Sequence, residues 1–75
     1  MNFKQATDAL LVSVTLEDLA TAMGVSLQAI RQARANEGTT AYRAPPEGWE
    51  RAVSKLAEGA ARRHLDLARK LRAVD

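Results

Sequence analysis

Cysteine is absent from this chain, and histidine occurs once, at position 64. The first absence excludes disulfide bonds and cysteine-ligated metal sites. Aromatic residues are scarce too, with one Phe, one Tyr and one Trp, so the core must consist mainly of Leu, Val, Ala and Ile. No apolar run approaches the ~20 residues that a membrane-spanning helix needs. The first residues, MNFKQATD, lack the basic-then-apolar pattern of a signal peptide, so we expect a cytoplasmic protein.

The residues that catalysis or ligand binding would need are also missing. His64 has no nucleophile at a useful spacing, and Asp66, two positions later, faces elsewhere on a helix. A glycine-rich phosphate loop is absent. The acidic residues near predicted helix starts are explained as charges that oppose the helix dipole; they are Glu17, Asp18, Glu47 and Glu50. We therefore expect no enzymatic activity, metal, cofactor or small-molecule ligand.

The length of 75 residues predicts one small domain, residues 1–75. A domain of this size buries a low fraction of its surface, so pairing with a second copy is an ordinary route to more buried area. Eleven Lys and Arg residues against nine Asp and Glu give a net charge of +2. This charge suits a polyanionic partner without requiring one.

Two short helices joined by a tight turn are predicted over residues 15–36. Thr15 is suited to cap the first helix, about 16–23, and Gly24 suits its end because glycine adopts positive φ without steric cost. Ser26 can accept free amide hydrogens at the start of the second helix, about 27–35. A turn this short forces a sharp crossing between the helices, which is typical of a helix-turn-helix motif.

The outward face of the second helix carries the chemistry of a base reader. If Ile30 and Ala33 point inward, a rotation of 100° per residue places Gln28 and Gln32 on the opposite side and Arg31 on one flank. Side-chain amides can bond to adenine edges in the major groove, and guanidinium groups can bond to guanine edges. This pattern favours binding to double-stranded DNA.

The segment TLEDLATAMGVSLQAIRQARA resembles the helix-turn-helix of the phage Cro/repressor family of bacterial regulators. Ala20 matches the small residue where the helices cross, and Gly24 matches the turn glycine. Val25 and Ile30 match buried positions around the second helix. Ala33 departs from the pattern, because many members carry a larger aliphatic residue there. The resemblance implies that the following residues face DNA: Ser26, Gln28, Ala29, Arg31 and Gln32.

The segments on either side of the motif have clear signals of their own. Asn2 is suited to cap a first helix, about 3–12, and the β-branched run at 12–15 ends it. A short strand there would have no visible partner. Residues 39–46 are predicted to form a loop. In one interpretation Tyr42 and Arg43 touch the DNA backbone. In the other, Tyr42 packs on the core edge and Arg43 faces solvent. Arg34 and Asn36 complete the predicted DNA-contacting set.

A long helix, about 46–73, follows the loop, with Pro46 suited to its first position. An apolar stripe with alternating spacings of three and four residues runs along it, beginning at Trp49. Its first half is expected to pack on the motif, which leaves the second half with nothing in its own chain to cover it. Around Gly59 the helix either crosses another helix closely, which we favour slightly, or breaks. The basic residues of the second half, including Arg62 and Arg63, are interpreted as a solvated face.

This surplus of apolar surface predicts a homodimer. The residues assigned to its interface are Ala60, His64, Leu67, Leu71 and Val74. The sequence as a whole predicts an all-α, helix-turn-helix domain of four or five helices that binds DNA as a dimer and represses transcription. Its two recognition helices would enter successive major grooves. The alternative is a helical protein–protein interaction module, antitoxin-like or adaptor, that uses the stripe of the long helix.

Overall fold

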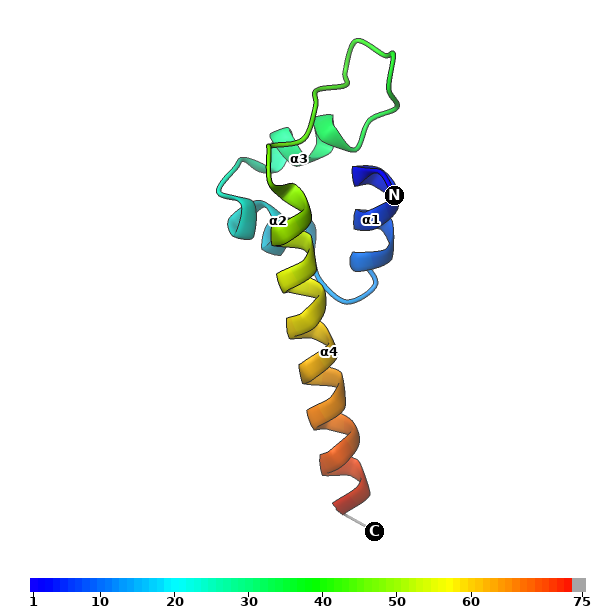
Figure 1. The fold of residues 1–75 in the computed structure, drawn as a ribbon, viewed down its shortest axis with the longest axis vertical. Helices are drawn as coiled ribbons and strands as arrows, with labels where there is room; N and C mark the ends of the chain where they lie inside the picture. Colours follow the sequence, from blue (N-terminus) through cyan, green and yellow to red (C-terminus); the bar gives the residue numbers. More distant parts are fainter. Residues whose placement is uncertain (74–75) are drawn as a thin grey trace.

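The computed structural model describes residues 1–73, which form four helices and contain no strand. Helix α1 spans Phe3–Leu10, α2 spans Leu16–Met23, α3 spans Leu27–Ala33 and α4 spans Trp49–Ala73. The predicted all-α fold with a long C-terminal helix is therefore confirmed. The first three helices surround the beginning of α4, and the rest of α4 extends away from them (Figure 1). The molecule is accordingly elongated, with extents of 54 × 20 × 18 Å.

The first two helices begin at the residues that the sequence indicates. The Asn2 side chain accepts a hydrogen bond from the Gln5 amide at 2.8 Å, and the Gln5 side chain accepts one from the Asn2 amide at 3.0 Å. Thr15 and Asp18 form the same reciprocal pair at the start of α2, at 3.0 and 3.1 Å. These capping boxes satisfy amide hydrogens that have no partner inside the helix.

Helices α1 and α3 are shorter than predicted. Helix α1 ends at Leu10 rather than at residue 12, and the Val12 side chain is 86% exposed. Val14 then turns back into the core. Helix α3 ends at Ala33 rather than at residue 35.

The predicted start of the long helix at Pro46 is wrong. Gly48 has a φ of 81°, which a right-handed helix cannot contain, so α4 begins only at Trp49. Glu50 lies in its first turn, whereas Glu47 lies in the preceding loop. Helix α4 is continuous through Gly59, so the alternative of two shorter helices is excluded.

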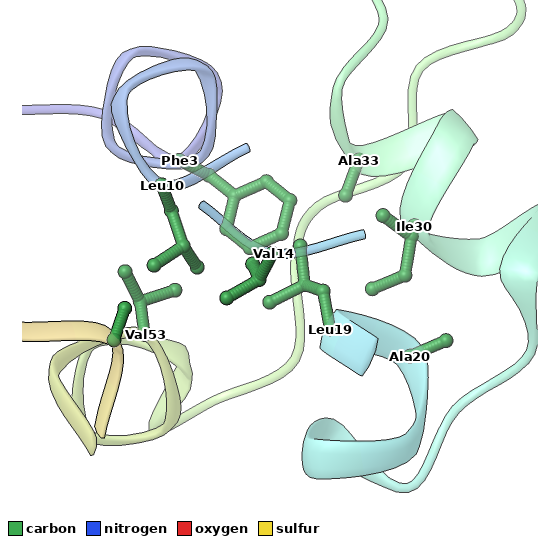
Figure 2. Packing of buried hydrophobic residues seen from close by; sticks show 9 residues of the cluster. Phe3, Leu10, Val14, Leu19, Ala20, Ile30, Ala33 and Val53 are labelled. Atoms are coloured by element: carbon green, nitrogen blue, oxygen red, sulfur yellow. The ribbon is translucent and has the colours of Figure 1, made fainter. Parts of the chain in front are cut away.

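The core lies where α1, α2 and α3 meet the first half of α4. Its largest fully buried apolar side chains are Leu19 of α2 and Ile30 of α3 (Figure 2). Phe3 packs edge-on against Trp49, with ring centroids 5.2 Å apart and planes at 90°, and so joins α1 to the start of α4. The other buried apolar residues are Leu10, Val14, Ala20, Ala33, Val53 and Ala60.

Helix α4 divides into a packed half and a bare half. Val53 and Ala60 belong to the core, whereas Leu67 and Leu71 remain 54% and 61% exposed. The predicted division of this helix is therefore confirmed. None of the helices described is both long and apolar enough to cross a membrane.

Candidate nucleic-acid interface

The turn between α2 and α3 has the geometry that the sequence predicts. Gly24 has a φ of 67°, and its N–H donates to the carbonyl oxygens at the end of α2. The next amide, that of Val25, donates to the Ala20 carbonyl at 3.1 Å. The Ser26 hydroxyl then accepts a hydrogen bond from the Ala29 amide at 3.1 Å. Three residues thus end one helix and start the next, which fixes the angle between them.

The buried side of α3 determines which side chains remain outside. Ile30 and Ala33 point into the core, opposite Leu19 of α2 (Figure 2). Ala33 is 3% exposed although it is small, and it lies near Phe3 of α1 (Figure 2). Both residues also line an open hollow beside the loop, so α1 and the loop supply the surroundings of Ala33 without filling them completely. On the outer side, Ser26, Gln28 and Arg31 are exposed, and Ala29 and Gln32 are partly buried.

Arg34 does not lie on this outer side, and its assignment as a DNA-contacting residue is corrected. Its guanidinium forms an ion pair with Asp8 of α1, and its Nε donates to the Thr7 hydroxyl at 3.3 Å. Thr7 is fully buried, and its own hydroxyl donates to the Phe3 carbonyl at 2.8 Å. Arg34 therefore anchors the end of α3 to α1, and its charge is paired with Asp8 at a partly exposed site. Sequence spacing gives no signal for this, since Arg34 and Asp8 are 26 residues apart.

The loop between α3 and α4 projects beyond α3 at the end of the molecule opposite the C-terminus (Figure 1). Its returning segment is tied to α3, because the Arg43 amide donates to the Gln32 carbonyl at 3.1 Å. The Arg43 side chain is exposed, and its Nη1 donates to the carbonyls of Thr40 and Tyr42 at 3.0 and 2.7 Å. A guanidinium has five N–H donors, so most of them still face outward.

Tyr42 and Asn36 are placed differently from each other. Tyr42 is partly buried and lines an open hollow of about 450 Å³ between the loop, Phe3 and Trp49, which agrees with packing at the core edge. Asn36 is exposed, and its carbonyl accepts hydrogen bonds from the amide and hydroxyl of Thr39 at 3.3 and 2.7 Å. The structure thus brings Gln28 and Arg31 together on α3 and sets Tyr42 apart from them.

One carboxylate close to the motif is electrostatically perturbed. The pKa of Asp18 is lowered, chiefly because its carboxylate accepts the hydrogen bond from the Thr15 backbone amide, with a further contribution from the Thr15 hydroxyl. Arg63 of α4 lowers the pKa further through its positive charge. Asp18 lies at the start of α2, so its charge stabilises that helix end.

The structure places the residues predicted for a dimer interface in different environments. His64, Leu67 and Leu71 are exposed on the bare half of α4. Ala60 is 5% exposed and packs in the core of its own chain, beside a groove between α1 and α4, so its place in an interface stays a prediction. Val74 lies outside the residues described. Leu65, which the sequence pattern does not single out, is 49% exposed on the bare half as well.

Comparisons with known proteins give the chain no relative. Neither family models, nor curated proteins, nor solved structures include one that matches it. Any statement about what this surface binds therefore depends on the exposed side chains of α3 and the loop.

Proposed function

We propose that this protein binds double-stranded DNA in a sequence-selective manner, with α3 in the major groove. The observation that carries the proposal is the outer side of α3. It presents the Gln28 amide and the Arg31 guanidinium on a helix whose other side is held in the core by Ile30 and Ala33. Groups that read base edges must be presented on a rigid support, because each hydrogen bond depends on its geometry.

The contacts divide into those that read bases and those that hold the backbone. Gln28 is suited to adenine, whose N7 and N6 match a side-chain amide, and Arg31 is suited to guanine through O6 and N7. Gln32, partly buried beside the loop, reaches the same groove from one flank. Arg43 on the projecting loop supplies a phosphate contact, which positions the protein without reading sequence.

The simplest biological activity for such a binder is repression of transcription by occupying a promoter. We propose that it acts as a homodimer in the cytoplasm of a bacterial or phage-infected cell. The site would be roughly palindromic, because a two-fold symmetric reader requires a two-fold symmetric sequence. Binding alone, without catalysis, metal or cofactor, is the activity proposed.

Selection from random-sequence duplex DNA at ~150 mM salt, near physiological screening, tests the proposal directly. We expect enrichment of a site with two related halves whose separation is a whole number of helical turns. A Gln28→Glu, Gln32→Glu variant is the control, because it places two carboxylates against the DNA and leaves the buried side of α3 unchanged. If the wild-type protein enriches no site more strongly than this variant does, the DNA-binding proposal is refuted.

A helical protein–protein module is the second candidate, and the exposed Leu67 and Leu71 are the observation that favours it. These leucines belong to the second half of α4, and that half extends away from α3 (Figure 1). The Gln28→Glu, Gln32→Glu variant therefore separates the two candidates, since it should abolish DNA binding and leave any association through α4 intact.

A further inference from the structure

The bare half of α4, residues 61–73, lacks the packing that a stable helix needs. Isolated helices of about 12–15 residues are marginally stable in water, and most helical stability in proteins comes from burying an apolar face. The second half of α4 extends away from the body formed by α1, α2 and α3 (Figure 1), and its leucines are exposed. Arg69 pairs with Asp66 at 3.8 Å on the exposed surface, and a pair of this kind adds little stability. A partner along this segment would supply the missing burial.

An apolar groove lies nearer the start of α4, on the face of the helix that carries Leu67 and Leu71. Helix α1 and α4 leave between them a groove of about 440 Å³, whose walls include Ala9 of α1 and Ala61 of α4. Ala60 and His64 line the same groove, and His64 is its lining residue farthest along α4. At 100° per residue, Leu67 and Leu71 fall within about 20° of Ala60 around the helix axis. Protruding leucines and an alanine-lined groove thus share one face of one helix.

We propose that two copies pair through this face in antiparallel orientation, so that the leucines of each copy enter the groove of the other. A two-fold axis near residues 65–66 would set Leu71 over the partner's Ala60 and Leu67 against the partner's His64. The layer of Leu71 and Ala60 joins a large side chain to a small one, which is how helices interlock closely, and in the other layer Leu67 lies against the imidazole ring. Isologous pairing of this kind satisfies both copies with the same contacts and closes at a dimer.

A parallel pair is disfavoured by the position of α1. Helix α1 packs on α4 on the face that Leu67 and Leu71 continue, so parallel α4 helices would have both α1 helices forced between them. In the antiparallel pair, each bare half instead runs into the space directly beyond the partner's α1. Asp18 lies near Arg63 at the flank of this space.

The area that a stable interface must bury also favours the antiparallel pair in which both grooves are filled. A stable interface buries about 1,200–2,000 Å² in total, and the contact of two bare helical ends alone is limited to a few leucines from each. Filling both grooves adds the apolar surfaces of two α1 helices to that contact. The occupant that fits the groove is therefore the end of α4 from a second copy.

Introduced cysteines test this arrangement cleanly, because the chain has no thiol of its own. In the Ala61→Cys, Leu71→Cys double variant, mild oxidation should give a covalent dimer, and neither single variant should. A covalent dimer from Leu71→Cys alone would show the parallel arrangement and overturn the proposal. Within one chain the two positions are about 15 Å apart along the helix, too far for a disulfide.

Sedimentation velocity on matched variants gives a second test. Leu71→Asp on the bare half and Ala9→Arg in the groove should each raise the dimer dissociation constant at least tenfold. Leu65→Asp is the control, because Leu65 has similar exposure on the opposite face of α4 and should leave the dimer unchanged. Circular dichroism spectra confirm that each variant folds. A monomeric wild-type chain, or equal losses in all three variants, would overturn the proposal.

The arrangement also sets the spacing of a DNA site, a consequence that depends on the proposed DNA binding. With the axis near residues 65–66, the starts of the two α4 helices lie about 50 Å apart, more than one helical turn of DNA at ~34 Å. Half-sites two turns apart are expected, and half-sites one turn apart would contradict the antiparallel pair. Failure of all DNA binding with the covalent dimer intact would refute the proposed function and leave this pairing standing.

Discussion

Arg34, directly after α3, forms an ion pair with Asp8 of α1. The pair is only partly covered, with the arginine side chain 19% exposed and the aspartate 54%. Its position at the end of α3 means that α1 fixes the direction in which the outer side of α3 faces. A residue that resembles a DNA contact in sequence thus serves to orient the residues that are proposed to make the contacts.

Replacing Asp8 and Arg34 one at a time should distinguish the contribution of the ion pair to stability from that of the hydrogen bond between Arg34 and Thr7. Asp8→Ala should lower the free energy of unfolding by about 0.5 kcal/mol, as is common for a partly exposed pair. Arg34→Ala should lower it by about 1–2 kcal/mol, because it also loses the bond to Thr7 and the packing of its aliphatic stem. Urea unfolding followed by Trp49 fluorescence, with the double variant completing a thermodynamic cycle, measures both. A coupling of zero would contradict the pairing.

Gln28→Ala should relax base preference at one position of the selected site. A good bidentate contact contributes about 1–3 kcal/mol of discrimination, so the preference at that position should fall roughly ten- to a hundredfold. Titration of the variant against single-base variants of the site measures this. Unchanged selectivity at every position would remove Gln28 from the readout.

Arg43→Ala should weaken binding to all sequences by a similar factor, because a phosphate contact carries no sequence information. The slope of log K against log salt should become shallower by about one unit for each half-site, reflecting one fewer displaced counterion. Fluorescence anisotropy between about 50 and ~200 mM salt tests this, since the affinity of a phosphate-binding protein changes steeply over that range. A loss confined to particular sequences would instead assign Arg43 to base contacts.

Two glycines should respond to alanine in opposite directions. Gly24 has a φ of 67° and open space where a side chain would lie, so Gly24→Ala should lower stability by about 1–2 kcal/mol through backbone strain alone. Gly59 lies inside α4, where an added Cβ would meet only the end of Arg63 at 3.5 Å. Gly59→Ala should therefore raise stability by about 0.5–1 kcal/mol. Thermal unfolding of the two variants beside the wild type provides the comparison.

Asp18 should make stability fall as the solution becomes acidic. Because its folded-state pKa is lowered by the Thr15 hydrogen bonds, its charge stabilises the fold above the unfolded-state pKa of ~3.9. This contribution disappears as pH falls through the lower folded-state pKa. Asp18→Asn removes the charge and keeps an acceptor, so its melting temperature should be lower than that of the wild type near pH 7 and converge with it in acid. A difference that is constant with pH would contradict this role.

Local signals were sufficient to predict the beginnings of the first three helices. Asn2, Thr15 and Ser26 each accept a backbone amide three residues later, and Gly24 adopts the positive φ expected of it. These features depend on residues within one turn of each other, so no tertiary information was needed. At the start of α4 two local signals competed. The preference of Pro46 for a first helical position was outweighed by Gly48, whose positive φ ends the loop two residues later.

Contacts between distant segments could not be predicted in the same way. The role of Arg34 depends on α1 lying across the end of α3, and the role of Ala60 depends on α1 packing against α4. In the sequence alone, Arg34 has the pattern of a surface position, and Ala60 belongs to the apolar stripe with no signal of which segment covers it. For the candidate site, the exposed positions of Gln28 and Arg31 followed from helical periodicity, whereas the burial of Tyr42 required the path of the loop.

The contact between Phe3 and Trp49 has a consequence for the order in which the chain can fold during synthesis. The core contains residues from α1 and from the first half of α4, so it cannot close until Val53 and Ala60 have been added. Residues 15–36 are made earlier, and their apolar side stays uncovered until Val53 and Ala60 have been added. The bare half of α4 is made after these core residues, when the rest of the domain is already able to fold. The proposed assembly with a second copy would therefore follow the completion of each individual core.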